Sequence, residues 1–412
     1  MFALIINLIN VLFLTYLVCY YIKYRIDTSL LWYSIVSLFF INIPLLFDNC
    51  LLYYDIDLFN NIQLNSNVYW ELNFVSDFLR VSLCSLMFNL CFFLSYRFIT
   101  RKKIFTFIFL ESNKKASILF PWIIYFLVSY FGLLLFMYHN NISSFSFIGT
   151  GLWYQNRNDN AVINLLVNLL VPIMPVSLFV SLVFRKYLLG FLCIIPVILI
   201  AIITGARSQY ITIAFYLLYY IIWKLGLKQF SFNSLIKLFI VSVSIAVFIM
   251  SLRSESNTYP LSKDLSYCDL FYVFQNSNAF TTEGTNFIRL ILTGFYDYSV
   301  NDVTAELANY KFFQGWGTLH PTLLGWAYAD LQGYFWVLSL FFGTFLGFYD
   351  LLRHSILYKY NIFFLAFLFS FISISVRGSV QYAYSTIIYP FFILVLFYTY
   401  IKKKRNENNI SS

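Results

Sequence analysis

Two arginines stand alone in long uncharged stretches of the chain. Arg207 is the only charged residue in a stretch of 37 residues, and Arg377 is the only one in a stretch of 42. Each has glycine and serine neighbours, and a guanidinium fork with nearby hydroxyl, amide and backbone donors matches the oxygens of a phosphate. We predict that both bind a diphosphate; the alternative is that they reach lipid headgroups or pair with a loop acid. Further candidates for the same ligand are Ser208, Gln209, Arg253 and Arg289.

A histidine and an aspartate occupy a second stretch, 316–333, which is rich in aromatic and small residues. Pro321 suits the first position of a helix, which makes His320 its N-cap, where the helix dipole favours a neutral imidazole. A neutral histidine in a polar cleft can accept a proton, so His320 is the first candidate for a general base. Asp330 is the second candidate, able to orient a base or bind sugar hydroxyls. The alternatives are a histidine that only caps a helix and an acid that is merely solvated at a membrane boundary.

The composition indicates whether these residues lie in a soluble or a membrane protein. The 412 residues include 27 Lys and Arg and 18 Asp and Glu, so that 11% are charged, while 60% are hydrophobic and 22% aromatic. A soluble domain carries about 25% charged residues. The composition therefore excludes a soluble globular or disordered protein and indicates an integral membrane protein. No nucleic-acid-binding motif accompanies the net charge of +9.

Apolar runs predict an all-α polytopic membrane protein with about 11 transmembrane helices, within a range of 10–12. Each run is close to the roughly 20 residues that cross a bilayer. The expected helices are 2–22, 29–47, 78–99, 117–138, 161–184, 187–204, 210–223, 232–252, 331–350, 360–376 and 380–401.

Charges in the connecting segments alternate and predict the orientation. One side of the membrane holds 19 of the 27 basic residues, giving charges of +15 against −6 on the other side. By the positive-inside rule the basic side is cytoplasmic, which places the N-terminus outside and the C-terminus inside. We divide the chain into helices one to eight at 1–252, a large outer loop with short helices at 253–330, helices nine to eleven at 331–401 and a basic cytoplasmic tail at 402–412. Arg207 and Arg377 then lie at outer hairpin tips, where an arginine partly withdrawn from water usually has an anionic partner.

The layout and these motifs resemble the Wzy-type O-antigen polymerases, which polymerise oligosaccharide repeat units and are related to the O-antigen ligases. The matching features are the turn Gly205-Ala206-Arg207-Ser208, the large late outer loop, and the stretch through Asp330 and Gly333. The resemblance covers the whole chain by layout and residues 204–209, 316–333 and 375–381 by motif. The ligases carry a histidine in the large loop, which His320 matches.

The resemblance implies a GT-C-like architecture in a bacterial inner membrane. It implies glycosyl transfer from an undecaprenyl-diphosphate-linked O-antigen or capsule oligosaccharide at the periplasmic face, with a chain-length regulator protein and membrane lipids as further partners. Arginines would neutralise the leaving diphosphate, and the sequence suggests no metal site, cofactor or nucleic acid. Two alternatives stay open, a ligase-type glycosyltransferase and a lipid-linked oligosaccharide flippase or transporter.

Overall fold

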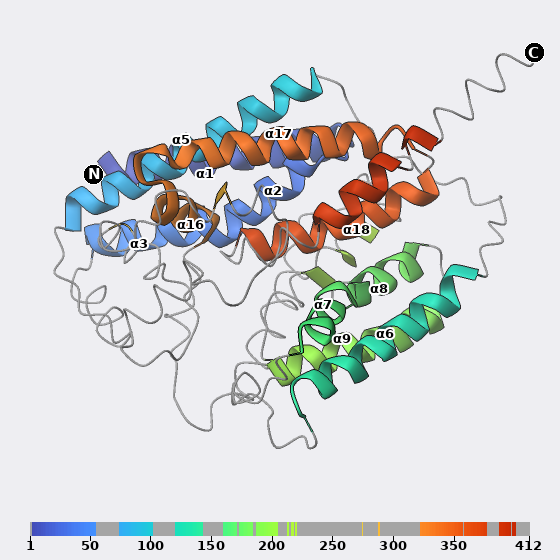
Figure 1. The fold of residues 1–412 in the computed structure, drawn as a ribbon. Coiled ribbons are helices and arrows are strands. Elements are labelled where there is room, and N and C mark those ends of the chain that lie inside the picture. The colour runs from blue at the N-terminus through green and yellow to red at the C-terminus, as the bar shows by residue number, and fades with distance from the viewer. Residues whose placement is uncertain are drawn as a thin grey trace, which may run out of the picture. The chain divides into compact units, whose positions relative to one another are not determined.

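The computed structural model describes eleven α-helices and the turns between some of them. The described residues are 2–54, 74–101, 120–142, 160–170, 173–183, 187–204, 212–213, 216–217, 219–220, 274, 287–288, 322–356, 358–376, 387–396 and 398–400. The named helices are α1 (Phe2–Lys23), α2 (Ser29–Ser37), α3 (Ile43–Tyr54), α5 (Phe74–Thr100), α6 (Phe120–His139), α7 (Ala161–Leu170), α8 (Ile173–Val183), α9 (Tyr187–Thr204), α16 (Thr322–Leu331), α17 (Phe335–Arg353) and α18 (Tyr358–Ser375). Figure 1 labels each of these helices.

Nearly all of the described residues are helical, and several helices are able to span a membrane. Within the described ranges, four helical stretches are long and apolar enough: Phe2–Lys23, Ser29–Cys50, Phe78–Thr100 and Thr322–Arg353. The predicted all-α fold is confirmed for the described residues, and these four stretches are consistent with the predicted membrane protein. The fourth stretch begins nine residues before the predicted start at residue 331. The expected helix at 232–252 lies outside the described residues.

The chain divides into two compact units. The first contains Met1–Thr106, Tyr259–Ser355 and Ile374–Ser412, and the second contains Phe107–Thr258 and Ile356–Ser373. The predicted division into spans, loop and tail concerns the membrane topology and stays a prediction.

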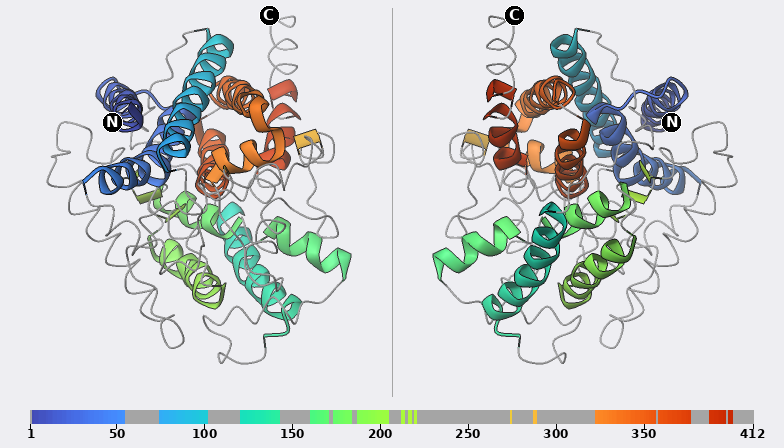
Figure 2. Two further views of the ribbon diagram at one scale, coloured as in Figure 1. Left: turned by 90° about the vertical axis from the view of Figure 1, so that its left-hand side faces the viewer. Right: turned by 90° about the vertical axis from the view of Figure 1, so that its right-hand side faces the viewer.

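Helices α1, α5 and α17 of the first unit run in the same direction. Asn89 of α5 donates to Asn10 of α1, and farther along both helices Phe93 packs edge-on against Phe13. The turned views of Figure 2 show α17 beside α5. The C-terminal ends of the three helices therefore lie together and form what we call the basic end. Its cationic residues are Lys23, Arg25, Arg97, Arg101 and Arg353.

Small residues allow α17 to pack closely against α5. Ser339, Gly343 and Gly347 recur every four residues and therefore share one face of α17. The hydroxyl of Ser339 donates to the carbonyl oxygen of Phe88. A Cβ at Gly343 would lie 2.5 Å from the carbonyl oxygen of Phe92, and one at Gly347 would lie 3.0 Å from Ile99 side-chain atoms. This approach matches the packing of membrane helices through small residues.

A π-helical segment, η1 (Leu38–Asn42), joins α2 to α3 within one apolar stretch. The side-chain nitrogen Nδ2 of Asn42 donates to the carbonyl oxygen of Ser37 at 2.9 Å, which satisfies a backbone group at the π turn. Asn10 donates to Asn42 at 2.6 Å and to Ser85 at 3.1 Å, and Tyr33 donates to Asn89 at 2.8 Å. These buried side chains hydrogen-bond α1, the α2–α3 stretch and α5 to one another, as polar groups do between membrane helices.

A buried ionic cluster lies at the basic end. Arg353 donates to Asp27 at 2.9 Å and to Asp350 at 3.0 Å, and its side chain is fully buried. Asp350 also accepts from the backbone amide and hydroxyl of Ser29, at 2.7 and 2.8 Å, and from the hydroxyl of Tyr96 at 2.5 Å. The cluster therefore fixes the turn between α1 and α2 to the end of α17 and to α5.

The cluster also sets the charge of His354, whose Nε2 lies 2.9 Å from the carbonyl oxygen of Asp27. Burial and then the nearby Arg353 lower the pKa of His354 from 6.5 to about 4. Burial opposes ionisation of Asp27, but Arg353 and His354 outweigh it and lower the pKa of that carboxyl below 3.8. At neutral pH His354 is therefore neutral and Asp27 is ionised.

Acid is expected to destabilise the protein through His354. The unfolded histidine titrates near 6.5 and the folded one near 4, so the unfolded state binds more protons between these values and stability falls as the pH falls. The full contribution is about 3 kcal/mol. A His354→Gln variant, which keeps a donor for the Asp27 carbonyl, should show a flatter decline of the melting temperature from pH 6.5 to pH 4 in detergent. An equally steep decline would contradict the assignment.

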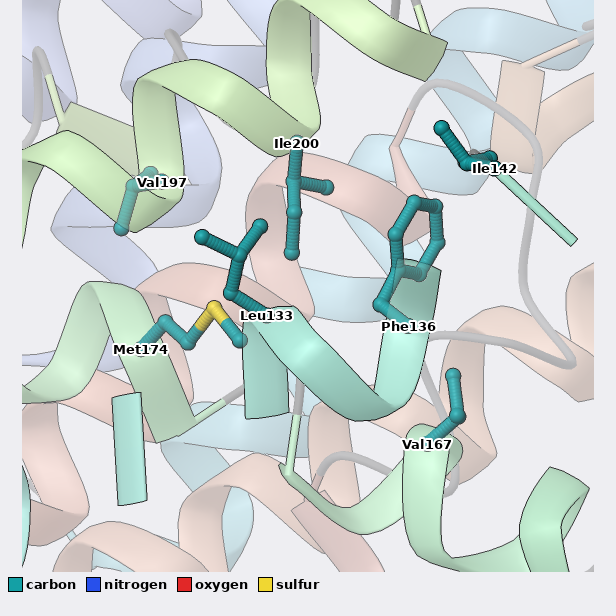
Figure 3. Packing of buried hydrophobic residues seen from close by; sticks show 7 residues of the cluster. All are labelled: Leu133, Phe136, Ile142, Val167, Met174, Val197 and Ile200. Atoms are coloured by element: carbon teal, nitrogen blue, oxygen red, sulfur yellow. The ribbon is translucent and has the colours of Figure 1, made fainter. Parts of the chain in front are cut away.

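The second unit has an apolar core formed by α6, α7, α8 and α9. Figure 3 shows its buried cluster: Leu133, Phe136, Ile142, Val167, Met174, Val197 and Ile200. A separate aromatic group forms where Phe179 of α8 stacks on Tyr216 at 4.7 Å and meets Phe369 of α18 edge-on at 5.6 Å. These contacts give the unit its hydrophobic stabilisation.

Candidate functional site

One of the residues predicted from the sequence to act in the site, Asp330, lies within the described part of the structure. It is on α16, and its carboxylate is 1% exposed. The other predicted site residues lie outside the described residues: Arg207, Ser208, Gln209, Arg253, Arg289, His320 and Arg377.

Helix α16 is a short helix that is buried almost throughout. Its first residue, Thr322, has a φ of 69°, a left-handed conformation that a β-branched residue adopts only under constraint. The Thr322 hydroxyl oxygen accepts the backbone amide of Gly325 at 3.4 Å. After Leu331 the chain turns through Gln332, whose φ is 47°, and η6 (Gln332–Tyr334) leads into α17. This break separates α16 from the longer helix.

The start of α16 is bound to Val376, a residue of the same unit. The backbone amide of Leu323 donates to the carbonyl oxygen of Val376 at 3.0 Å. His320 precedes Leu323 by three residues, and Arg377 directly follows Val376. The structure thus joins the two sequence segments that carry the predicted base and one predicted diphosphate ligand.

A corresponding contact in the second unit involves the segment after Arg207. The hydroxyls of Thr212 and Ser373 lie 2.6 Å apart, and both side chains are buried. Thr212 follows Arg207 by five residues. This hydrogen bond attaches the helical segment after Arg207 to α18.

Asp330 accepts a backbone hydrogen bond instead of facing water. Its Oδ2 atom accepts the amide of Phe287 at 2.7 Å. The predicted alternative of an acid that is merely solvated at a boundary is wrong, because Asp330 is buried. Phe287 and Ile288 are helical.

Arg80 is a neighbour of this site that sequence reasoning missed. It is exposed on α5, where it donates to the hydroxyl of Tyr328 and lies over the ring, with 5.1 Å from its guanidinium carbon to the ring centroid. The ring of Phe274 stacks on Tyr328 with centroids 3.9 Å apart. The available signal was an arginine inside the apolar run 78–99, because such residues are rare in spans and often functional.

The aromatic residues of α16 are interior residues. Trp326 is 0% exposed and Tyr328 is 3% exposed. Neither therefore presents an open ring to a sugar or to lipid headgroups. Their burial makes α16 a packed support for the residues around it.

Arg80, Tyr328 and Asp330, with Phe274 and Phe287, form what we call the α16 cluster. It combines an exposed cation, a buried carboxylate and stacked aromatic rings. In the described residues, no group of three or more His, Cys, Asp or Glu side chains could hold a metal ion. Comparison of the chain with protein-family models, curated proteins and solved structures gave no match.

Proposed function

We propose that the protein is a bacterial inner-membrane glycosyltransferase that polymerises undecaprenyl-diphosphate-linked O-antigen or capsule repeat units at the periplasmic face. The observation that carries this proposal is the bond from Leu323 to Val376. This bond connects the segment that follows His320 to the residue that precedes Arg377. A glycosyl-transfer site needs its base and its diphosphate ligand close together, and the bond supports such an arrangement. About 11 spans and a GT-C-like architecture belong to the same proposal.

The proposed reaction is a displacement at the anomeric carbon of the donor sugar. The hydroxyl oxygen of the acceptor sugar forms the new glycosidic bond, and the bond from the anomeric carbon to the diphosphate oxygen breaks. His320 takes the hydroxyl proton. The leaving group is undecaprenyl diphosphate, and Arg207 and Arg377 neutralise its charge, assisted by Ser208 and Gln209. Arg253 and Arg289 are additional ligands of the lipid-linked glycan.

Arg207→Ala and Arg377→Ala are each expected to shorten the surface polysaccharide. Loss of one donor to a developing anion typically costs about 10²- to 10³-fold in rate. The measurement is the length distribution of the polysaccharide at matched protein levels. His320→Ala should have a comparable effect, and Arg101→Ala, at the basic end, is the control that should leave chain length unchanged. Wild-type chain lengths in both arginine variants would refute the diphosphate assignment.

A deletion strain separates the proposed polymerase from its alternatives. A polymerase deletion should leave a single repeat unit on the lipid core. Polymer that stays on its lipid carrier would indicate a ligase. Loss of both the single repeat unit and the polymer would indicate a flippase. The large loop on one face supports chemistry over alternating access, because a transporter is expected to use both faces.

A further inference from the structure

Two separate residues of the large loop pack back onto α16, the helix that ends it. Phe274 stacks on Tyr328 with an interplanar angle of 16°, and the backbone amide of Phe287 donates to Asp330. Tyr328 and Asp330 are two residues apart on α16. A single helical turn therefore receives loop residues that are thirteen positions apart in the sequence.

Phe287 is held on two sides. Its amide donates to Asp330 at 2.7 Å, and its ring meets Phe341 of α17 edge-on with centroids 5.5 Å apart. Phe287 and Ile288 are both helical. A carboxylate is well suited to accept this amide, because charge strengthens the hydrogen bond.

We infer that Asp330 is a positioning residue that docks the large loop onto α16, and that it does not act as the base. A general base must reach the hydroxyl from which it takes a proton. Asp330 is 1% exposed, and one of its carboxylate oxygens is already bonded to the backbone of the loop. Asp330 therefore affects catalysis only indirectly, by fixing the position of the loop.

Asparagine distinguishes the two roles. An Asp330→Asn variant keeps an oxygen that accepts the Phe287 amide but cannot accept a proton, whereas Asp330→Ala loses both abilities. We expect Asp330→Asn to retain polymerisation within about 5-fold of the wild type with an unchanged pH profile, and Asp330→Ala to lose about 10- to 100-fold, which corresponds to the loss of a hydrogen bond to a charged group.

Hydrogen exchange of the full-length protein in detergent tests docking without reference to activity. The amide of Phe287 should be protected in the wild type and in Asp330→Asn, and it should exchange about 10- to 100-fold faster in Asp330→Ala. Unchanged exchange in Asp330→Ala would overturn the inference. Loss of activity in Asp330→Asn while Phe287 stays protected would also overturn it, in favour of a chemical role.

The activity readout rests on the proposed function, and the exchange readout does not. If the wild type makes no polymer but the exchange pattern is as expected, the proposed function fails and the docking role stands. If the wild type polymerises and the exchange pattern is absent, the docking role fails alone.

Discussion

An Arg353→Met variant is expected to lose about 3–5 kcal/mol of unfolding free energy. The substitution keeps much of the apolar volume of the side chain but leaves Asp27 and Asp350 buried without their shared cation. Removing one partner of a buried ion pair lowers the free energy of unfolding, because the remaining charge is withdrawn from water and has no counter-ion to stabilise it. The melting temperature of the purified protein in detergent and the amount recovered from membranes are the measurements.

The basic end offers a matched control for Arg353. Arg101 is exposed at the same end, so Arg101→Met should change stability by no more than about 0.5 kcal/mol. Replacing Asp27 and Asp350 by Asn in the Arg353→Met background should recover part of the loss, because neutral amides tolerate burial better than carboxylates. A melting temperature equal to that of the wild type in Arg353→Met would show that the cluster contributes nothing to folding.

A Gly343→Leu variant is expected to separate α17 from α5 and to cost about 3 kcal/mol or more. Its Cβ would lie 2.5 Å from the carbonyl oxygen of Phe92 and closer still to the hydroxyl of Ser95. A backbone carbonyl in a helix cannot rotate out of the way as a flexible side chain can. The two helices must therefore move apart, which also strains the bond from Ser339 to Phe88.

Gly333 is the control position for the leucine substitution, because its surroundings leave room for a side chain. A Cβ at Gly333 meets nothing within 4 Å, so Gly333→Leu should be nearly neutral. The comparison uses thermal unfolding of both variants in the same detergent. Similar melting temperatures for the two leucine variants would mean that the close approach of α5 and α17 is not needed for stability.

The long apolar helices could be predicted from the sequence, whereas the breaks and irregular turns between helices could not. The runs 2–22 and 78–99 predicted α1 and most of α5, because a long apolar stretch has few alternatives to a membrane helix. The run 331–350 predicted α17, and Pro321 predicted a helix start close to that of α16. The break between the two helices, at the left-handed turn of Gln332, was not predicted. The π segment at Leu38–Asn42 was equally hidden, and the side chain of Asn42 bonds there to the carbonyl oxygen of Ser37, five residues earlier.

Long-range pairs were beyond sequence reasoning. Asp27 and Arg353 entered the topology only as loop charges, although they bind each other in the interior. Arg80 was counted as one more basic residue, and its contact with Tyr328 required knowing that α5 and α16 meet. The segments of His320 and Arg377 were selected by their residue types, and the structure added that their neighbours are bonded. The roles of those two side chains stay predictions.

The ion cluster has a consequence for the order of events at the ribosome. Asp27 and Arg353 are separated by 326 positions. At about 5–20 residues per second, Arg353 is synthesised roughly 15–65 s after Asp27. The turn between α1 and α2 therefore cannot reach its final packing until α17 has been synthesised. Chains that terminate before α17 would lack the cation that Asp27 binds.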